Sequence, residues 1–181
     1  MQQRRVTWGW AALGCVLPGL VSAALMASQA TVTFSCIGPG GLHFEGTGHE
    51  FQATEKGDLL VLTVKLSTVS TGIGVRDGHM QERYLESDKY PDAELAVPRA
   101  GLSFPGDGAT VDATAAGTVT LHGISRPAIF HYKATRKGNA YDVRGDLHIN
   151  MNDYGIPIPT YLGVTVRPGV DVQVSFRMAE T

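Results

Sequence analysis

The sequence predicts a single all-β domain, an antiparallel barrel or sandwich of about eight strands with one short helix. Segments in which apolar and polar residues alternate recur along the chain, and turn residues separate them at roughly 8–12-residue spacing. No rhythm of strands alternating with long helices is present, which argues against a parallel α/β sheet. The length of 181 residues, of which 43% are hydrophobic, suits one domain with one core.

Residues 1–30 are predicted to be a secretory signal peptide, which leaves residues 31–181 as the mature domain. The segment has a basic start, MQQRR, an apolar run that Pro18 interrupts, and small residues up to Ala30, where a signal peptidase would cut. Cleavage after Ala23 is an alternative. The proline and the small-residue end argue against an uncleaved membrane anchor. The protein is therefore expected to be periplasmic or secreted.

Two other processing signals in this segment are weaker. Arg4 and Arg5 form a twin-arginine pair, to which the flanking residues add little support. Cys15 follows Ala-Leu-Gly, as at a lipoprotein processing site, but the apolar run continues well past it. Without residues 1–30 the chain keeps one cysteine, Cys36, so no internal disulfide is expected. Its apolar surroundings favour a buried, inert thiol.

The first half of the mature domain is predicted to form strands separated by turns. TVTFSCI at 31–37 alternates and stops at GPGG, and LHFEGTGHEF at 42–51 resumes the pattern. LLVLTVKL at 59–66 has one fully apolar face, whereas its other face changes from apolar to charged. The apolar face of this third segment consists of Leu60, Leu62, Val64 and Leu66.

The stretch GIGVRDGHMQERYLESDKYPDAEL at 72–95 is the one place where helical spacing replaces alternation. It predicts a short helix over about 77–87, with Asp77 as the cap of its first turn. Pro91 ends helical structure and leads into a strand at 93–97. We interpret the charged cluster as a solvated helix face in which the two arginines pair with Glu82 or Glu86. The cluster consists of Arg76, Asp77, His79, Glu82 and Arg83.

The second half returns to strands. A Gly/Ala-rich stretch at 100–117 is interpreted as a loop with a short strand. In the last predicted strand apolar and polar residues alternate, which predicts that its even-numbered residues, among them Val172 and Val174, lie on one face. The predicted strands lie at 115–124, 126–136, 140–151 and 170–178, and two prolines make 156–166 begin as a loop or an edge.

Composition and motifs argue against several classes of function. A formal net charge of −2 and the lack of any basic run argue against nucleic acid as a partner. Ser125 lacks the Gly-x-Ser-x-Gly elbow of a serine nucleophile, so no catalytic residue is assigned. The histidines form no His-x-His or His-Glu-x-x-His set, so no metal site is assigned either. They are His43, His49, His79, His122, His131 and His148.

Three blocks of the sequence together resemble the YceI-like proteins. RDGHMQERYLESDKYPDAEL at 76–95 resembles the signature block of that family, and GTVTLHGISRPAIF at 117–130 resembles its second block. NDYGIP at 152–157, followed by VRPGVDVQVSF, resembles its closing segment, with a tyrosine where Asp-Phe-Gly is usual. The blocks occur in the family's order over about 70–178. The first strand departs from the family pattern, because it ends in a Gly-rich turn.

The resemblance implies an extended, lipocalin-like antiparallel β-barrel that is periplasmic or secreted. Such barrels hold a long apolar ligand, a polyisoprenoid or a similar lipid, and need neither a metal or other cofactor nor a catalytic residue. The motif positions that the resemblance carries over are Arg76, Asp77, His79, Tyr90 and Pro91.

An eight-stranded barrel is the size at which the interior is either filled by side chains or holds one small ligand. Burying an isoprene unit gives roughly 4 kcal/mol, at about 0.8 kcal/mol for each CH₂-sized group. Association costs about 4–15 kcal/mol, so only a chain of several units binds tightly. We assign His79 to the mouth, where it could contact a polar headgroup. The ligand-binding residues expected are Leu60, Leu62, Val64, Leu66, Val119, Leu121, Phe130, Tyr132, Val172, Val174 and His79.

The sequence thus predicts an exported, non-enzymatic protein that binds a long-chain isoprenoid, an isoprenoid quinone, a fatty amide or another lipid for transport, storage or sequestration. The mature chain has no long apolar run, so it is not expected to insert stably in a membrane. A homodimer is compatible with the sequence. One alternative is a lipid-modifying or metal-assisted enzyme, which requires the histidines and Asp77 to converge. The other is a filled structural barrel that binds an exported protein.

Overall fold

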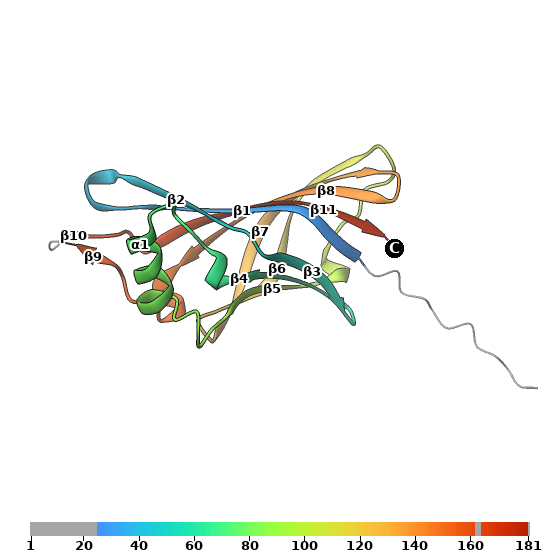
Figure 1. Cartoon of the computed structure of the whole chain (residues 1–181). Coiled ribbons are helices and arrows are strands. Elements are labelled where there is room, and N and C mark those ends of the chain that lie inside the picture. The colour runs from blue at the N-terminus through green and yellow to red at the C-terminus, as the bar shows by residue number, and fades with distance from the viewer. Residues whose placement is uncertain (1–24, 162–163, 181) are drawn as a thin grey trace, which may run out of the picture.

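The computed structural model describes residues 25–161 and 164–180, and it has the predicted all-antiparallel, lipocalin-type fold (Figure 1). Nine of the described strands form one curled sheet, a half-barrel, in the order β2-β1-β11-β8-β7-β6-β5-β4-β3. These strands are β1 (Leu25–Ile37), β2 (His43–Gly48), β3 (Phe51–Lys56), β4 (Leu59–Lys65), β5 (Asp92–Pro98), β6 (Thr110–Leu121), β7 (Ile124–Lys137), β8 (Ala140–Asn150) and β11 (Gly169–Glu180).

The remaining elements lie at the turns of the sheet. A short hairpin extends beyond it at the same end as the helix (Figure 1). The hairpin consists of β9 (Thr160–Tyr161) and β10 (Val164–Thr165). The helix α1 (Gly74–His79) continues into a π-helical turn, η3 (Met80–Tyr84). The 3₁₀ turns are η1 (Pro39–Gly41), η2 (Leu66–Thr68), η4 (Arg99–Gly101) and η5 (Met151–Tyr154).

The sheet curls because the chain passes directly from one of its edges to the other. β2 pairs with β1, up to Val32 opposite Gly48. After a corner at residues 49–50, β3 pairs with β4, starting with Phe51 opposite Val64. The two edge strands are therefore consecutive in sequence, and the sheet wraps around an interior instead of lying flat.

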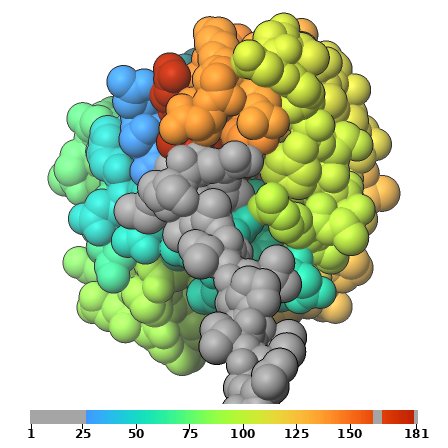
Figure 2. All heavy atoms as spheres, turned by 90° about the vertical axis from the view of Figure 1, so that its right-hand side faces the viewer, coloured from blue at the N-terminus to red at the C-terminus, as the bar shows by residue number. Residues whose placement is uncertain are grey.

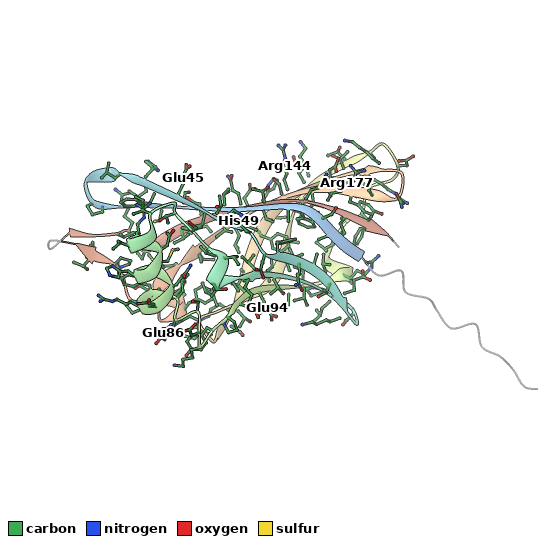
Figure 3. The ribbon with its side chains drawn as sticks, viewed as in Figure 1. Glu45, His49, Glu86, Glu94, Arg144 and Arg177 are labelled. Atoms are coloured by element: carbon green, nitrogen blue, oxygen red, sulfur yellow. The ribbon has the colours of Figure 1, made fainter. Side chains whose placement is uncertain are left out.

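Side chains point alternately to the inside and to the outside along each strand, which gives the sheet an inner and an outer wall. On β11, Val174 and Phe176 face inward, whereas Arg177 projects from the outer surface, as does Arg144 on β8 (Figure 3). At the helix end a cluster of buried residues packs against Met80 and Tyr84 of η3 and closes the barrel. That closing cluster consists of Leu66, Val69, Val119, Leu121, Met151, Tyr154 and Ile156.

Some element boundaries differ from those predicted. β6 begins at Thr110, inside the stretch that we expected to be mostly loop, because it pairs with β7 along its whole length. Its small residues are required where β5 crosses closely: a Cβ on Gly117 would lie 2.9 Å from the carbonyl oxygen of Ala96. Cross-strand pairing here outweighs the low strand propensity of Gly and Ala. β3 was not predicted as a strand, and β1 starts at Leu25 instead of residue 31.

The prediction that Asp77 caps the helix was wrong. The helix begins at Gly74, so Asp77 lies within it, and its carboxylate accepts hydrogen bonds from the Ser70 hydroxyl and the Thr71 amide, both at 2.7 Å. Desolvation raises the pKa of Asp77, but these hydrogen bonds and the nearby Arg76 outweigh it and lower that pKa. Asp77 thus fixes the loop before the helix.

The predicted ion pairs along the helix face were also wrong where the structure gives partners. Arg76 donates to the side-chain and main-chain oxygens of Thr71 and stacks over the Phe44 ring, 5.0 Å from its centroid. Glu86 instead pairs with His122 at 2.9 Å. Arg76 thus contacts the preceding loop and β2, and Glu86, just after η3, contacts the turn between β6 and β7. Cys36 is half-buried, and this burial raises the pKa of its thiol, with Arg76 opposing, as an inert thiol requires.

Candidate ligand-binding cavity

The curled sheet encloses a cavity of about 180 Å³ whose wall is almost entirely apolar. Every strand of the sheet except β2 contributes to the lining, and residues 102–104 complete it. On β11 the lining runs from Val172 to Met178, and the six steps between these seven residues of an antiparallel strand span about 20 Å. The cavity is therefore long and narrow. Apolar cavities of comparable size, about 150 Å³, stay dry and accept small apolar molecules.

Nine of the eleven residues expected to bind the ligand lie along this cavity. Leu66 does not: it lies on η2 and is 5% exposed, whereas Val119 and Leu121 of the same closing cluster do line the cavity. His79 does not either, because it ends α1 outside the barrel wall. The nine lining residues are Leu60, Leu62, Val64, Val119, Leu121, Phe130, Tyr132, Val172 and Val174. Their contact with a ligand stays a prediction.

The cavity also has lining residues that we did not assign. Some continue the alternation already recognised on β8 and β11, so extending the same phase would have found them. These are Val143, Leu147, Ile149, Phe176 and Met178. Leu102 and Phe104 carry no such signal, because they lie in an irregular loop where side chains have no period.

The end of the barrel opposite α1 is covered by the loop of residues 99–109. Figure 2 shows this end, with the loop in yellow-green beside the β7–β8 hairpin in orange. The main-chain amide of Ser103 donates to the hydroxyl of the buried Tyr132 at 2.8 Å. Phe104 packs edge-on against Tyr141, with ring centroids 6.0 Å apart, and the guanidinium of Arg99 lies 4.7 Å from the centroid of the Phe104 ring. The loop is thus held from inside the barrel.

The histidines do not converge on the cavity. None of the six, all of which lie in the described ranges, lines it. His131 and His148 project from the outer wall, where His148 pairs with Asp171 at 2.6 Å. His122 packs near the closing cluster, bonded to Glu86 and to the carbonyl oxygen of Tyr154. Within the described residues, no group of three or more His, Cys, Asp or Glu side chains is placed to hold a metal ion.

The imidazole of His131 lies between two carboxylates on the outer wall. Nε2 is 2.6 Å from Asp112 and Nδ1 is 2.8 Å from Asp146, so both ring nitrogens face acceptors. The hydrogen bonds to Asp112 and then Asp146 raise the pKa of His131, against a smaller opposing effect of desolvation.

We therefore expect His131 to titrate above its ordinary pKa of about 6.5. Because the folded-state pKa is raised, the stabilisation is complete below the unfolded value and is lost as the pH rises through the folded one. An NMR titration of the ring proton of His131 measures this pKa, and Asp112→Asn should lower it. Asp142→Asn, whose carboxylate pairs with Lys137 instead, is the control. An unchanged pKa in Asp112→Asn would contradict the assignment.

Comparison with known proteins finds one family model and several relatives that match most of the chain. The model of the YceI-like domain family matches residues 24–178. A UPF0312 protein of Pseudomonas savastanoi is 28% identical over 145 residues, covering 74% of this chain and 68% of the relative. A UPF0312 protein of Pseudomonas putida is 27% identical over 139 residues, covering 72% and 69%.

Two solved structures share the fold. A polyisoprenoid binding domain from Saccharophagus degradans, implicated in plant cell wall breakdown, superposes with a TM-score of 0.74 at 18% identity and covers 88% of this chain and 99% of its own. BcnA of Burkholderia cenocepacia superposes with a TM-score of 0.65 at 14% identity, covering 82% and 95%. Among the described residues, none of the helices has the length and hydropathy needed to cross a membrane.

Proposed function

The chain belongs to the YceI-like domain family, and from this premise we propose that it is a non-catalytic protein that holds a long apolar ligand in its barrel. The observation that carries the proposal is the long, narrow cavity with an apolar wall. The proposed ligand is a polyisoprenoid, an isoprenoid quinone or a fatty amide, held for transport, storage or sequestration. The similar Saccharophagus domain, which binds polyisoprenoid, supports this class of ligand.

The shape of the cavity favours a single extended chain over a compact ligand. Each CH₂-sized group that leaves water gives about 0.8 kcal/mol, so several isoprene units outweigh an association cost of about 4–15 kcal/mol. A narrow tube offers this burial only to a chain that enters it lengthwise. A filled structural barrel has no such space, and an enzyme would need polar groups where the lining is apolar. Both alternatives are therefore disfavoured.

The direct test is chemical. The protein, purified from its own host, is extracted with denaturing organic solvent, and the extract is analysed by mass spectrometry. We expect one long-chain isoprenoid or similar lipid for each chain. Native mass spectrometry of the intact protein gives the stoichiometry and also tests a homodimer. A native mass equal to that of the bare chain, with no lipid in the extract, would refute the carrier function.

We further propose that the protein is exported to the periplasm or secreted, and that the signal peptide is cleaved after Ala23. The predicted boundary at Ala30 would remove residues 25–28, which pair with β11 along Arg177–Glu180. Cleavage after Ala23 keeps the whole of β1, and Val21-Ser22-Ala23 offers small residues to the peptidase. The intact mass of protein recovered from the periplasm or medium should match a chain beginning at Ala24. A mass matching a start at Thr31, or recovery only of the uncleaved chain, would contradict this.

A further inference from the structure

The barrel wall contains a seam between β7 and β8, which consists of residues 124–130 and residues 147–150. The two strands pair from Lys137 opposite Ala140 down to His131 opposite Asp146, and there the pairing ends. β7 stays paired with β6, and β8 stays paired with β11, to the ends of both strands. Along the β7–β8 seam the two strands therefore present unpaired main-chain edges to each other.

Local sequence accounts for the seam. Pro127 has no amide hydrogen, and proline in a sheet is confined to such edges. On the other strand, the side chain of Asn150 accepts from the amide of Asn152 and starts η5, which turns the chain away from β7. Arg126, next to the proline, reaches across the gap and donates from Nε to the carbonyl oxygen of Asp153 at 3.1 Å.

A surface groove follows the seam and meets the cavity. The groove is lined by both strands and by η5, with Arg126, Ile129, His148 and Asp153 among its residues. Ile149 lines both the groove and the cavity. Asp146, where pairing ends, also contributes to the cavity lining, although its carboxylate lies on the outer wall against His131. Two inward-facing residues of β8 beside the seam, Leu147 and Ile149, are only partly buried, whereas Phe130 on β7 is buried. The cavity thus reaches the protein surface at this place.

Each proposed ligand has a polar end, which the apolar cavity cannot accommodate without leaving it unpaired. That end must lie where the cavity reaches polar groups. At the loop end these groups already have partners, since Arg99 pairs with Glu55 and the Ser103 amide is held by Tyr132. At the seam, within the described part of the chain, the Nη groups of Arg126 have no acceptor, and the facing edges of β7 and β8 are not paired with each other.

We propose that the β7–β8 seam binds the polar end of the ligand, with Arg126 donating to its oxygen, while the apolar tail extends into the cavity. This inference rests on the proposed function and adds an orientation to it. It also predicts the chemistry of the polar end, which must accept hydrogen bonds, as a hydroxyl, a carbonyl or a phosphate oxygen does. Arg126 and Pro127 belong to the second block of the sequence that resembles the family, so the seam gives that motif a use.

Photoaffinity labelling tests the orientation. Two derivatives of geranylgeraniol are used, one with a diazirine beside the hydroxyl and one with a diazirine at the tail terminus, and crosslinked peptides are mapped by mass spectrometry. We expect the hydroxyl-end label on residues 124–130 or 147–154 and the tail label on the interior of the barrel. A tail label inside the barrel with the hydroxyl-end label on residues 99–109 would overturn the inference and keep the proposed function. No saturable labelling by either probe would refute the proposed function itself.

The affinity of an Arg126 variant for geranylgeraniol is the second test. Arg126→Gln should weaken binding of geranylgeraniol about tenfold, the effect of losing a hydrogen bond from a charged group. Arg126→Lys keeps a cationic donor and should restore most of the affinity. The matched control is Arg144→Gln, which removes an arginine from the outer wall where β7 and β8 are paired (Figure 3). Equal affinities for Arg126→Gln and Arg144→Gln would contradict the assignment of Arg126.

Discussion

Replacing Val174 by tryptophan is expected to abolish tight binding of a prenyl probe such as geranylgeraniol while the barrel stays folded. Val174 lines the cavity in the middle of β11, and its partner on β8 is Gly145, which has no side chain. The indole therefore has room only over Gly145 and inward, where the tail would lie. Displacing a single isoprene unit removes roughly 4 kcal/mol of burial, so affinity should fall at least about 100-fold. Fluorescence or calorimetric titration measures the loss.

The same substitution one residue away is the control. Gln173 is the neighbour of Val174 on β11 and is exposed on the outer wall, so Gln173→Trp should keep its affinity within about twofold. Overpacking is expected to cost Val174→Trp about 1–3 kcal/mol of unfolding free energy, which a urea titration verifies. A folded Val174→Trp protein with unchanged affinity would mean that the ligand does not occupy this part of the cavity.

The strands that carry the cavity could be predicted because one physical pattern determines them. On β11 apolar residues alternate with polar ones, and on β4 one face is entirely apolar, so each pattern predicts the inner face without any knowledge of the neighbouring strands. Most of the assigned lining residues, such as Leu62 and Val172, follow from it. Which residues of a strand face inward depends on the pattern of neighbouring residues along the chain, so it can be inferred from a single sequence.

Features that depend on contacts between distant segments could not be predicted in this way. The loop of residues 99–109 covers one end of the barrel through contacts with distant strands, among them the hydrogen bond between Ser103 and Tyr132 and the packing of Phe104 on Tyr141. Asp77 has the residue type and the spacing of a helix cap, yet its partners are in the preceding loop. The curling of the sheet depends on the corner at residues 49–50, which no periodicity marks. The seam likewise appears only when the ends of two pairings are compared.

Replacing Phe176 by alanine is expected to cost about 3–5 kcal/mol of unfolding free energy, the range for removing a buried aromatic ring from a core. Phe176 is 6% exposed and stacks on Phe51, with ring centroids 4.9 Å apart. Phe51 lies on the edge strand β3, and Phe176 lies on β11, the third strand from the other edge, so the contact joins strands that are far apart in the strand order. Removing the ring thus weakens the place where the curled sheet meets itself. Urea unfolding, with the m-value unchanged, measures the cost.

Arg177→Ala separates this packing effect from an effect on β11 itself. Arg177 projects from the outer wall, beside Phe176 in sequence (Figure 3), so its loss should change stability by no more than about 0.5 kcal/mol. Phe176 also lines the cavity, so a ligand that fills the space should stabilise the variant as well as the wild type. At 100 times Kd this linkage is worth about 2.7 kcal/mol. A loss below about 1 kcal/mol in Phe176→Ala would mean that the aromatic contact does not hold the barrel closed, and that strand pairing alone keeps the cavity enclosed.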